Sequence, residues 1–163
     1  MRNKLFLVLA SVVAMLLLAS CDNALQPREE TQYKKDNDAF IEKVDKGTEY
    51  KKLVFLNAEH PIYYKVLASG TSKAYPYQES TVRTQLSGRL ISGEVFQADG
   101  ELVSQVNALI PGVQYALQSM NVGDKWEIVV PQQLGYGAYS RGYTIPAFST
   151  LIFTIELLEI VKP

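Results

Sequence analysis

Cysteine and histidine are almost absent from this chain, whose 163 residues include one of each. The single cysteine, Cys21, excludes an internal disulfide, so the fold must be stable through burial alone. The single histidine, His60, directly precedes a proline and has no second histidine to join it. This argues against a zinc site and against a catalytic triad built on histidine. We therefore expect neither a metal nor a cofactor.

An excess of basic residues is also missing. Lys and Arg total 16 and Asp and Glu total 17, a formal net charge of −1, so no nucleic-acid partner is expected. Methionine is scarce too, because Met120 is the only one after residue 20. The Met-rich surface used by some promiscuous binding proteins is therefore excluded.

Motifs of covalent or nucleotide chemistry are not visible. Gly135-Tyr136-Gly137 lacks the strand-turn-helix context of a phosphate-binding loop. Asp99 and Glu101 could form a carboxylate pair, but the pattern predicts a polar turn there, where solvated surface charge is the ordinary explanation. Neither feature predicts an active site.

The N-terminus has the pattern of an export signal. Arg2 and Lys4 precede an apolar run over residues 5–18, about 14 residues long, which suits a signal segment better than a spanning helix of about 20. The sequence Leu18-Ala19-Ser20-Cys21 then resembles the lipobox of bacterial lipoproteins. That resemblance implies a signal peptide at residues 1–20, a lipidated Cys21, and an extracytoplasmic protein anchored to a membrane of the cell envelope. An uncleaved anchor or an ordinary secretory signal is the alternative.

Residues 21–60 are expected to form a tether. The segment is polar and mixed in charge as far as residue 46, with one short amphipathic stripe at Phe40, Ile41 and Val44. Asp38 before this stripe and Gly47 after it favour a helix near residues 31–46. A disordered linker is the alternative. On either interpretation, the domain at 61–163 is expected to fold without this segment.

Residues 61–163 alternate between strand and helix patterns. In the second strand, Val82, Thr84 and Leu86 recur with period two, which places them on one face. Pro111 suits the first turn of a short helix that buries Val113 and its neighbours. The expected strands cover residues 62–67, 80–90, 126–130 and 150–160, and the helix covers residues 110–120. These elements predict an α+β fold, a twisted antiparallel sheet curled over one short α-helix.

An ordered series of motifs runs through the same region. They are Leu109-Ile110-Pro111-Gly112, Met120-Asn121-Val122-Gly123-Asp124, Trp126-Glu127-Ile128-Val129-Val130-Pro131, Leu134-Gly135-Tyr136-Gly137, Ile145-Pro146 and Thr150-Leu151-Ile152-Phe153-Thr154-Ile155-Glu156-Leu157-Leu158. In this order and at these spacings the domain resembles the FKBP-type peptidyl-prolyl cis-trans isomerases, and more closely their bacterial macrophage-infectivity-potentiator branch. The resemblance implies an FKBP-like fold and proline-containing polypeptide substrates.

The resemblance also implies a proline pocket, in which Tyr136 offers its hydroxyl, and Ile110 and Ile145 their backbone N–H groups, to substrate carbonyls. Ile145 belongs to an overhanging loop. The implied pocket residues are Leu86, Phe96, Gln97, Leu109, Ile110, Val113, Tyr136, Ile145 and Phe153. Without the family order, Phe96, Leu109 and Phe153 would be interpreted as ordinary core residues.

Several positions depart from the family pattern. Gln97 stands where an aspartate is common, Val113 where a tryptophan is common, and Leu86 where a tyrosine is common; Ala147 replaces the second proline after Ile145. These changes predict a shallower, less aromatic pocket. The sequence therefore leaves two hypotheses, a monomeric isomerase of weak activity that assists extracytoplasmic folding, or a lipoprotein that keeps the fold as a peptide-binding or chaperone module.

Overall fold

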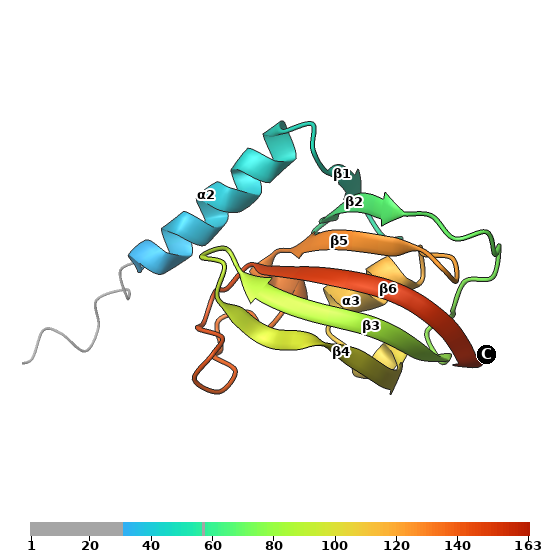
Figure 1. The fold of residues 1–163 in the computed structure, drawn as a ribbon. Helices are drawn as coiled ribbons and strands as arrows, with labels where there is room; N and C mark the ends of the chain where they lie inside the picture. The colour runs from blue at the N-terminus through green and yellow to red at the C-terminus, as the bar shows by residue number, and fades with distance from the viewer. Residues whose placement is uncertain (1–30, 57) are drawn as a thin grey trace, which may run out of the picture. The chain divides into compact units, whose positions relative to one another are not determined.

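The computed structural model describes residues 31–56 and 58–163 (Figure 1). The signal segment and Cys21 lie outside the described residues. No helix in the described part of the chain has the length and apolarity needed to cross a membrane. Residues Gln32–Pro163 form one compact unit. Its elements are α2 (Gln32–Lys46), β1 (Lys51–Leu53), β2 (Ile62–Ala68), β3 (Thr81–Leu90), β4 (Val95–Gln105), η2 (Val106–Ala108), α3 (Pro111–Leu117), β5 (Lys125–Val130), η3 (Gln132–Leu134) and β6 (Leu151–Lys162).

The strands form one six-stranded sheet with the order β1-β2-β5-β6-β3-β4. Each neighbouring pair is antiparallel, and β6 lies between β5 and β3. The sheet twists around the short helix α3, which packs against one face (Figure 1). This arrangement confirms the predicted α+β fold, a twisted antiparallel sheet curled over one short helix.

Helix α3 begins at Pro111, which has no N–H to leave unsatisfied in the first turn. The helix buries Val113, Ala116 and Leu117 against the sheet. Gly112 permits this close approach, because a Cβ atom there would lie 2.4 Å from Cγ1 of Val130. The helix therefore lies directly against the sheet, beside the strands that surround the candidate site.

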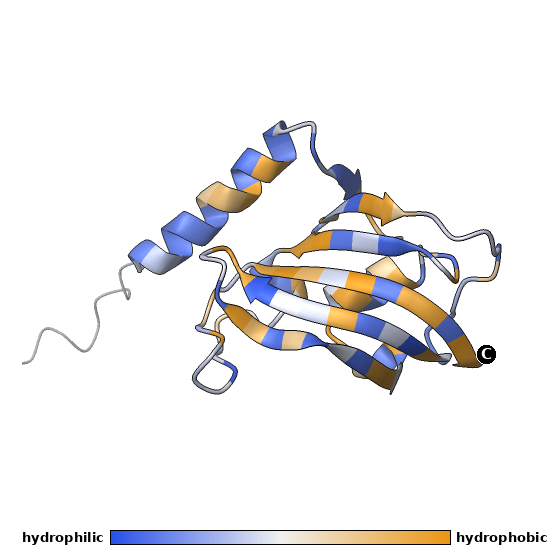
Figure 2. Ribbon diagram, viewed as in Figure 1, coloured by the Kyte–Doolittle hydropathy of each residue, from blue (hydrophilic) through white to orange (hydrophobic). Residues whose placement is uncertain are grey.

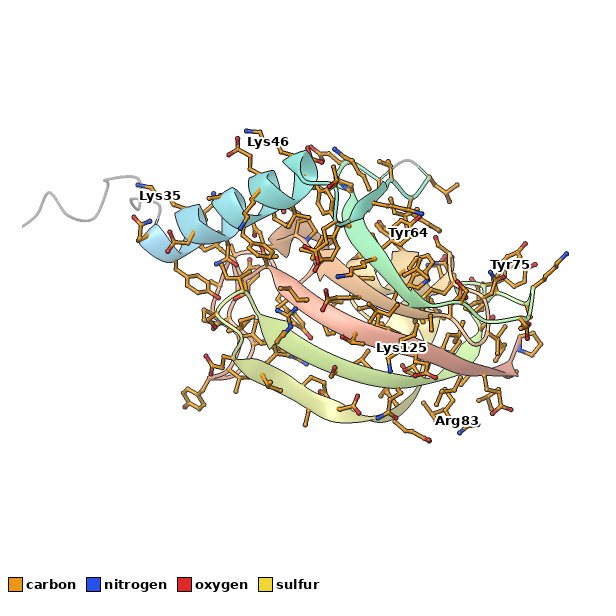
Figure 3. All side chains as sticks on the ribbon, turned by 45° about the horizontal axis from the view of Figure 1, so that its top comes forward. Lys35, Lys46, Tyr64, Tyr75, Arg83 and Lys125 are labelled. Atoms are coloured by element: carbon orange, nitrogen blue, oxygen red, sulfur yellow. The ribbon has the colours of Figure 1, made fainter. Side chains whose placement is uncertain are left out.

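Strand β3 shows the predicted period of two. Val82, Thr84 and Leu86 are buried on the inner face, while Arg83 points outward and pairs with Glu159 at 2.8 Å (Figure 3). The register of β3 shifts around Gly88. The pairing of β3 with β6 also shifts, between Thr81 and Val82 and between Arg83 and Thr84.

Strand β4 corrects one expectation. Asp99 and Glu101 lie inside this strand rather than in a turn, and Gln85 Nε2 donates to Asp99 Oδ2 at 2.8 Å across the β3–β4 pair. The sequence pattern concealed the strand because β4 is at the edge of the sheet and most of its residues are exposed. Both carboxylates belong to the solvated face, as their surface interpretation expected.

Helix α2 confirms the helix predicted near residues 31–46, but its packing differs from that of a tether. Val44 packs with Tyr63, Val129 and Ile152 in a second apolar cluster. Alternate residues of a strand point to opposite faces, so α2 covers the face opposite α3. The apolar residues of α2 stand out among its hydrophilic ones in Figure 2. The compact unit therefore includes α2 and starts at Gln32. The helix covers an apolar patch at Val129 and Ile152, on an outer face that elsewhere carries charged residues such as Lys125, Glu127 and Glu156.

Candidate functional site

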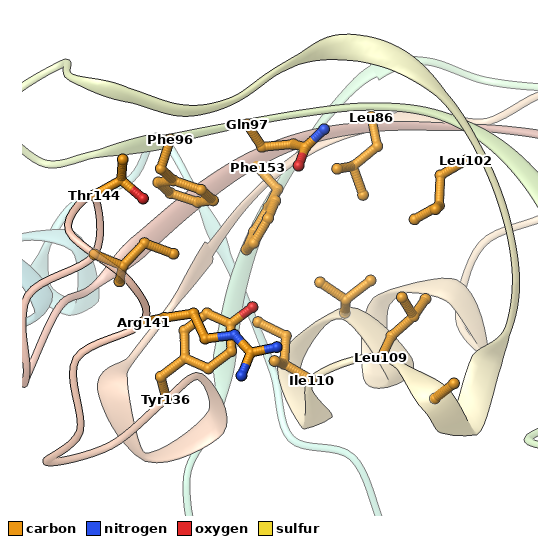
Figure 4. Close-up of a pocket in the computed structure, with 13 residues that line it drawn as sticks. Leu86, Phe96, Gln97, Leu102, Leu109, Ile110, Tyr136, Arg141, Thr144 and Phe153 are labelled. Atoms are coloured by element: carbon orange, nitrogen blue, oxygen red, sulfur yellow. The ribbon is translucent and has the colours of Figure 1, made fainter.

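A cavity of about 460 Å³ opens between the inner face of the sheet, the start of α3 and the loop after η3 (Figure 4). Every pocket residue implied by the sequence resemblance lines it. Four further residues, Leu102, Ala108, Arg141 and Thr144, complete the wall. Residues far apart in the chain are thus brought together around one hollow.

The strands supply the aromatic side of the cavity. Phe96 of β4 meets Phe153 of β6 edge to face, with ring centroids 5.4 Å apart and an interplanar angle of 81°. Gly88 of β3 makes room for both rings, because a Cβ atom there would lie 2.4 Å from Phe96 and 3.1 Å from Phe153. Leu86, two residues earlier, is 7% exposed and continues the wall.

The start of α3 supplies the apolar base. Val113 is 2% exposed and lines the cavity from the first turn of the helix. The segment before it is held by Gln114, whose Nε2 donates to the Leu109 carbonyl at 2.6 Å. The carbonyl of Ile110 accepts the N–H groups of Val113 and Gln114. The N–H of Ile110 forms no hydrogen bond with a described residue, so it remains available to a ligand.

The loop at residues 135–149 forms the remaining wall. Arg141 and Ile145 are joined by two backbone hydrogen bonds, and the N–H of Ile145 donates to the Arg141 carbonyl at 3.3 Å. This N–H was expected to serve a substrate, yet here it is occupied. The Tyr136 hydroxyl has no partner among the described side chains, and the Arg141 guanidinium lies 5.8 Å from the centre of the Tyr136 ring.

Most of the residues that line the cavity are apolar, and one carries a charged side chain. Arg141 alone among the lining residues carries charge, and no described carboxylate pairs with it. Gln97 is exposed at the rim, and its Nε2 donates to the Ala98 carbonyl at 3.3 Å. Within the described residues, no group of three or more His, Cys, Asp or Glu could hold a metal. The site is suited to binding an apolar ring and orienting amide groups.

Sequence reasoning missed Leu102, Ala108, Arg141 and Thr144. Leu102 lies on β4, which the apolar pattern did not reveal, and Ala108 ends the short turn η2. Arg141 and Thr144 lie between two recognised motifs, Leu134–Gly137 and Ile145-Pro146, in a stretch with no periodicity. Counting residues between those motifs would have marked the loop, but not which of its side chains face the cavity.

Comparison with known proteins places these features in a family. Residues 72–158 match the model of the FKBP-type peptidyl-prolyl cis-trans isomerase family. The chain is 43% identical over 109 residues to the FKBP-type 22 kDa peptidyl-prolyl cis-trans isomerase of Escherichia coli, covering 64% of this chain and 52% of that protein. It is 40% identical over 105 residues to the outer membrane protein MIP of Legionella longbeachae, covering 62% and 45%. The chain spans about half the length of these curated relatives.

Solved structures agree with the sequence comparison. A peptidyl-prolyl cis-trans isomerase from Pseudomonas syringae superposes with a TM-score of 0.71 at 29% identity, covering 82% of this chain and 98% of that one. FkpA from Escherichia coli gives a TM-score of 0.70 at 25% identity, covering 99% and 71%. With the family match, the shared fold and the assembled pocket, the chain belongs to the FKBP-type peptidyl-prolyl cis-trans isomerase family.

Proposed function

We propose that this protein catalyses cis-trans isomerisation of prolyl bonds in polypeptide chains. The observation that carries the proposal is the cavity lined by Phe96, Tyr136, Ile145, Phe153 and the other pocket residues. A proline ring offers an apolar face that such a wall can enclose. The adjacent amide oxygens offer acceptors to the Ile110 N–H and the Tyr136 hydroxyl.

The chemistry needs no bond between enzyme and substrate. Rotation about the prolyl amide loses resonance, and the barrier for a peptide bond is about 18–20 kcal/mol. A site that binds the twisted amide more tightly than the planar one lowers this barrier. Phe153 and Ile145 are buried and would place apolar surface around the ring, which favours the less conjugated and less polar twisted state.

Catalysis is proposed to be weak. Val113 provides a small aliphatic base where a flat aromatic ring would give more contact with a proline ring. Gln97 is neutral, so it supplies no negative charge toward the twisted amide. Leu86 likewise offers no hydroxyl to the substrate. The pocket therefore holds the ring by apolar contact and has few polar groups that act on the transition state.

The setting of the activity is proposed to be extracytoplasmic. The sequence at Cys21 supports a lipid anchor, and the similar Legionella protein is described as an outer membrane protein. The protein would then act as a monomer anchored to a membrane of the cell envelope, on chains that fold there, without nucleic acid.

Cys21→Ser should leave an unprocessed precursor or a released protein, whereas the unaltered chain should partition into detergent. An unmodified cysteine by mass spectrometry, in a chain that is already released, would contradict the anchor.

A second candidate function is a peptide-binding or chaperone module with little catalysis. Val113, Leu86 and Gln97 favour it, because each removes a contact that would act on the twisted amide and leaves the apolar hollow open. The two functions differ in rate enhancement, not in binding.

The decisive experiment measures prolyl isomerisation of a Leu-Pro peptide by the full-length chain in a protease-coupled assay. The isomerase proposal expects catalysis that scales with protein concentration, and loss of most of it in Phe153→Ala. If the chain binds the peptide, as measured by fluorescence, but does not catalyse its isomerisation, the result would support the peptide-binding module instead. Absence of both would contradict both functions.

A further inference from the structure

We infer that helix α2 positions the loop that closes the pocket, with Tyr33 and Asn37 as positioning residues. The helix precedes residues 72–158, the part of the chain that matches the family model. It hydrogen-bonds to residues 149–150, which follow Ile145 in the loop that lines the cavity. The inference rests on the proposed function for its catalytic readout only, because the contacts themselves can be measured without activity.

Asn37 makes the first connection. Its side chain is 0% exposed. Its Oδ1 accepts the backbone N–H of Thr150 at 2.7 Å, and its Nδ2 donates to the Tyr33 carbonyl at 2.8 Å. A donor on one side and an acceptor on the other give the amide a single orientation. A polar group buried this completely is tolerated because both of its ends are hydrogen-bonded.

Tyr33 makes the second connection. Its hydroxyl lies 2.8 Å from Ser149 Oγ, and Ser149 Oγ donates to the Pro146 carbonyl at 2.7 Å. A serine hydroxyl has one proton, so the Tyr33 hydroxyl must be the donor to Ser149. This relay of hydrogen bonds runs from α2 to Pro146, the residue directly after Ile145. The Ile145 side chain is 5% exposed and lines the cavity.

The loop end between these contacts is held in a costly conformation. Phe148 has φ of 65°, a left-handed value that is unfavourable for a bulky residue. Its N–H donates to the Gly137 carbonyl at 2.8 Å, beside Tyr136. Such a conformation persists only where the surroundings hold it. Here the flanking contacts are the hydrogen bond from Phe148 to Gly137 and the hydrogen bonds that join α2 to Ser149 and Thr150.

The hydrogen bonds from α2 are expected to pre-organise the loop wall of the pocket. A binding wall stabilises a transition state only if it is held near the productive geometry, and a loop is less precise than a helix or strand. Loss of the relay should let the 145–150 segment sample other conformations. Ile145 would then close the pocket for a smaller fraction of the time.

The test compares two matched hydroxyl deletions in the full-length chain. Tyr33→Phe removes the relay donor. Tyr50→Phe removes a similar bond between the N-terminal segment and the sheet, from Tyr50 to Glu127 at 2.6 Å, which lies away from the cavity. We expect Tyr33→Phe to lower kcat/KM by between about 2-fold and 10-fold, the range of one hydrogen bond, and Tyr50→Phe to leave it unchanged. Ser149→Ala should lower kcat/KM similarly and add little to Tyr33→Phe, because both break one relay.

A second readout separates positioning from general stability. In Tyr33→Phe, amide hydrogen exchange at Phe148 and Thr150 and tryptic cleavage after Arg141 should both become faster. Equal effects of Tyr33→Phe and Tyr50→Phe on activity would overturn the inference, as would unchanged exchange at residues 148–150. If the unaltered chain is inactive, the exchange and cleavage rates still decide the inference, whereas the proposed function alone would fail.

Discussion

Phe96 and Phe153 meet edge to face above Gly88, whose missing side chain leaves the space that both rings fill. The two rings come from β4 and β6, strands that lie on either side of β3. The aromatic wall of the pocket therefore depends on a position that contributes no side chain of its own. Phe96 is only partly buried, so one side of this contact is open to solvent.

Gly88→Ala should damage the pocket more than the fold. The new methyl would lie 2.4 Å from Phe96 Cε2, at the far end of a side chain that can rotate away. We expect weaker peptide binding and slower isomerisation, with a small loss in the free energy of unfolding. Gly100→Ala in β4 is the matched control, because the nearest contact there would be 4.0 Å away. Equal activity of both variants would contradict the proposed wall.

Tyr136→Phe tests the role of a hydroxyl without a partner among the described side chains. Since no internal hydrogen bond is lost, the free energy of unfolding should not change. Binding or turnover of a prolyl peptide should weaken by about 0.5–1.5 kcal/mol, one hydrogen bond. Tyr139→Phe, on an 80% exposed tyrosine of the same loop that does not line the cavity, should have no effect. An equal loss in both would point to the loop rather than to the hydroxyl.

The contacts of α2 and β2 predict a weakening of the fold at alkaline pH. Burial and a hydrogen bond to Asp45 raise the pKa of Tyr63 to about 12, above the ordinary value of about 10. The folded state thus keeps a proton that the unfolded state releases, so stability is complete below about pH 10 and falls as the pH rises toward about 12. In urea unfolding, the stability advantage of the unaltered chain over Tyr63→Phe should shrink across this range. A constant difference would contradict the raised pKa.

The resemblance to the family was sufficient to predict nine of the thirteen residues that line the cavity, because the order of the motifs reports a fold in which distant segments meet. The role of Gly88 in admitting Phe96 depends on a contact between strands that no local sequence pattern expresses. Strand β4 escaped detection for a related reason, since an exposed edge strand has little apolar alternation.

For the segment before residue 61, the sequence predicted the helix but not how the helix packs. The stripe of Phe40, Ile41 and Val44 predicted a helix, but not the surface that it covers. That surface includes Val129 and Ile152, which the sequence assigns to strands without revealing that they form an apolar patch on the second face of the sheet. The buried Asn37 gave no signal at all, because its partner at Thr150 is more than a hundred residues away.

Val113→Trp with Gln97→Asp tests the cause of the proposed weak catalysis. Val113 lines the cavity, and an indole there would give the proline ring a flat contact. Gln97→Asp would add a negative charge at the rim. We expect the double variant to exceed the unaltered chain in kcat/KM, by roughly 2-fold to 10-fold for an aromatic contact of about 0.5–1.5 kcal/mol. Val113→Leu is the control for added volume without a ring. Robust activity in the unaltered chain that neither substitution improves would mean that other contacts act on the amide.

Arg141 predicts a preference among substrates by charge. It is exposed at the cavity, it lies over the Tyr136 ring, and it is the one charged residue in a wall without carboxylates. A peptide with an acidic residue beside its proline would bring a carboxylate near this unpaired guanidinium. An exposed ion pair contributes about 0.2–1 kcal/mol, so the preference for Glu-Pro over Lys-Pro peptides should be a few-fold in kcat/KM.

The measurement uses Glu-Pro, Leu-Pro and Lys-Pro peptides with the unaltered chain and Arg141→Gln. The substitution should remove the difference between Glu-Pro and Lys-Pro while leaving the rate with Leu-Pro nearly unchanged, because the apolar wall is intact. Raising the ionic strength should reduce the preference in the unaltered chain, since salt screens exposed charges, and should do little to Arg141→Gln. A preference that survives both the substitution and the salt would have to arise from the shape of the pocket, and Arg141 would then be only a part of its wall.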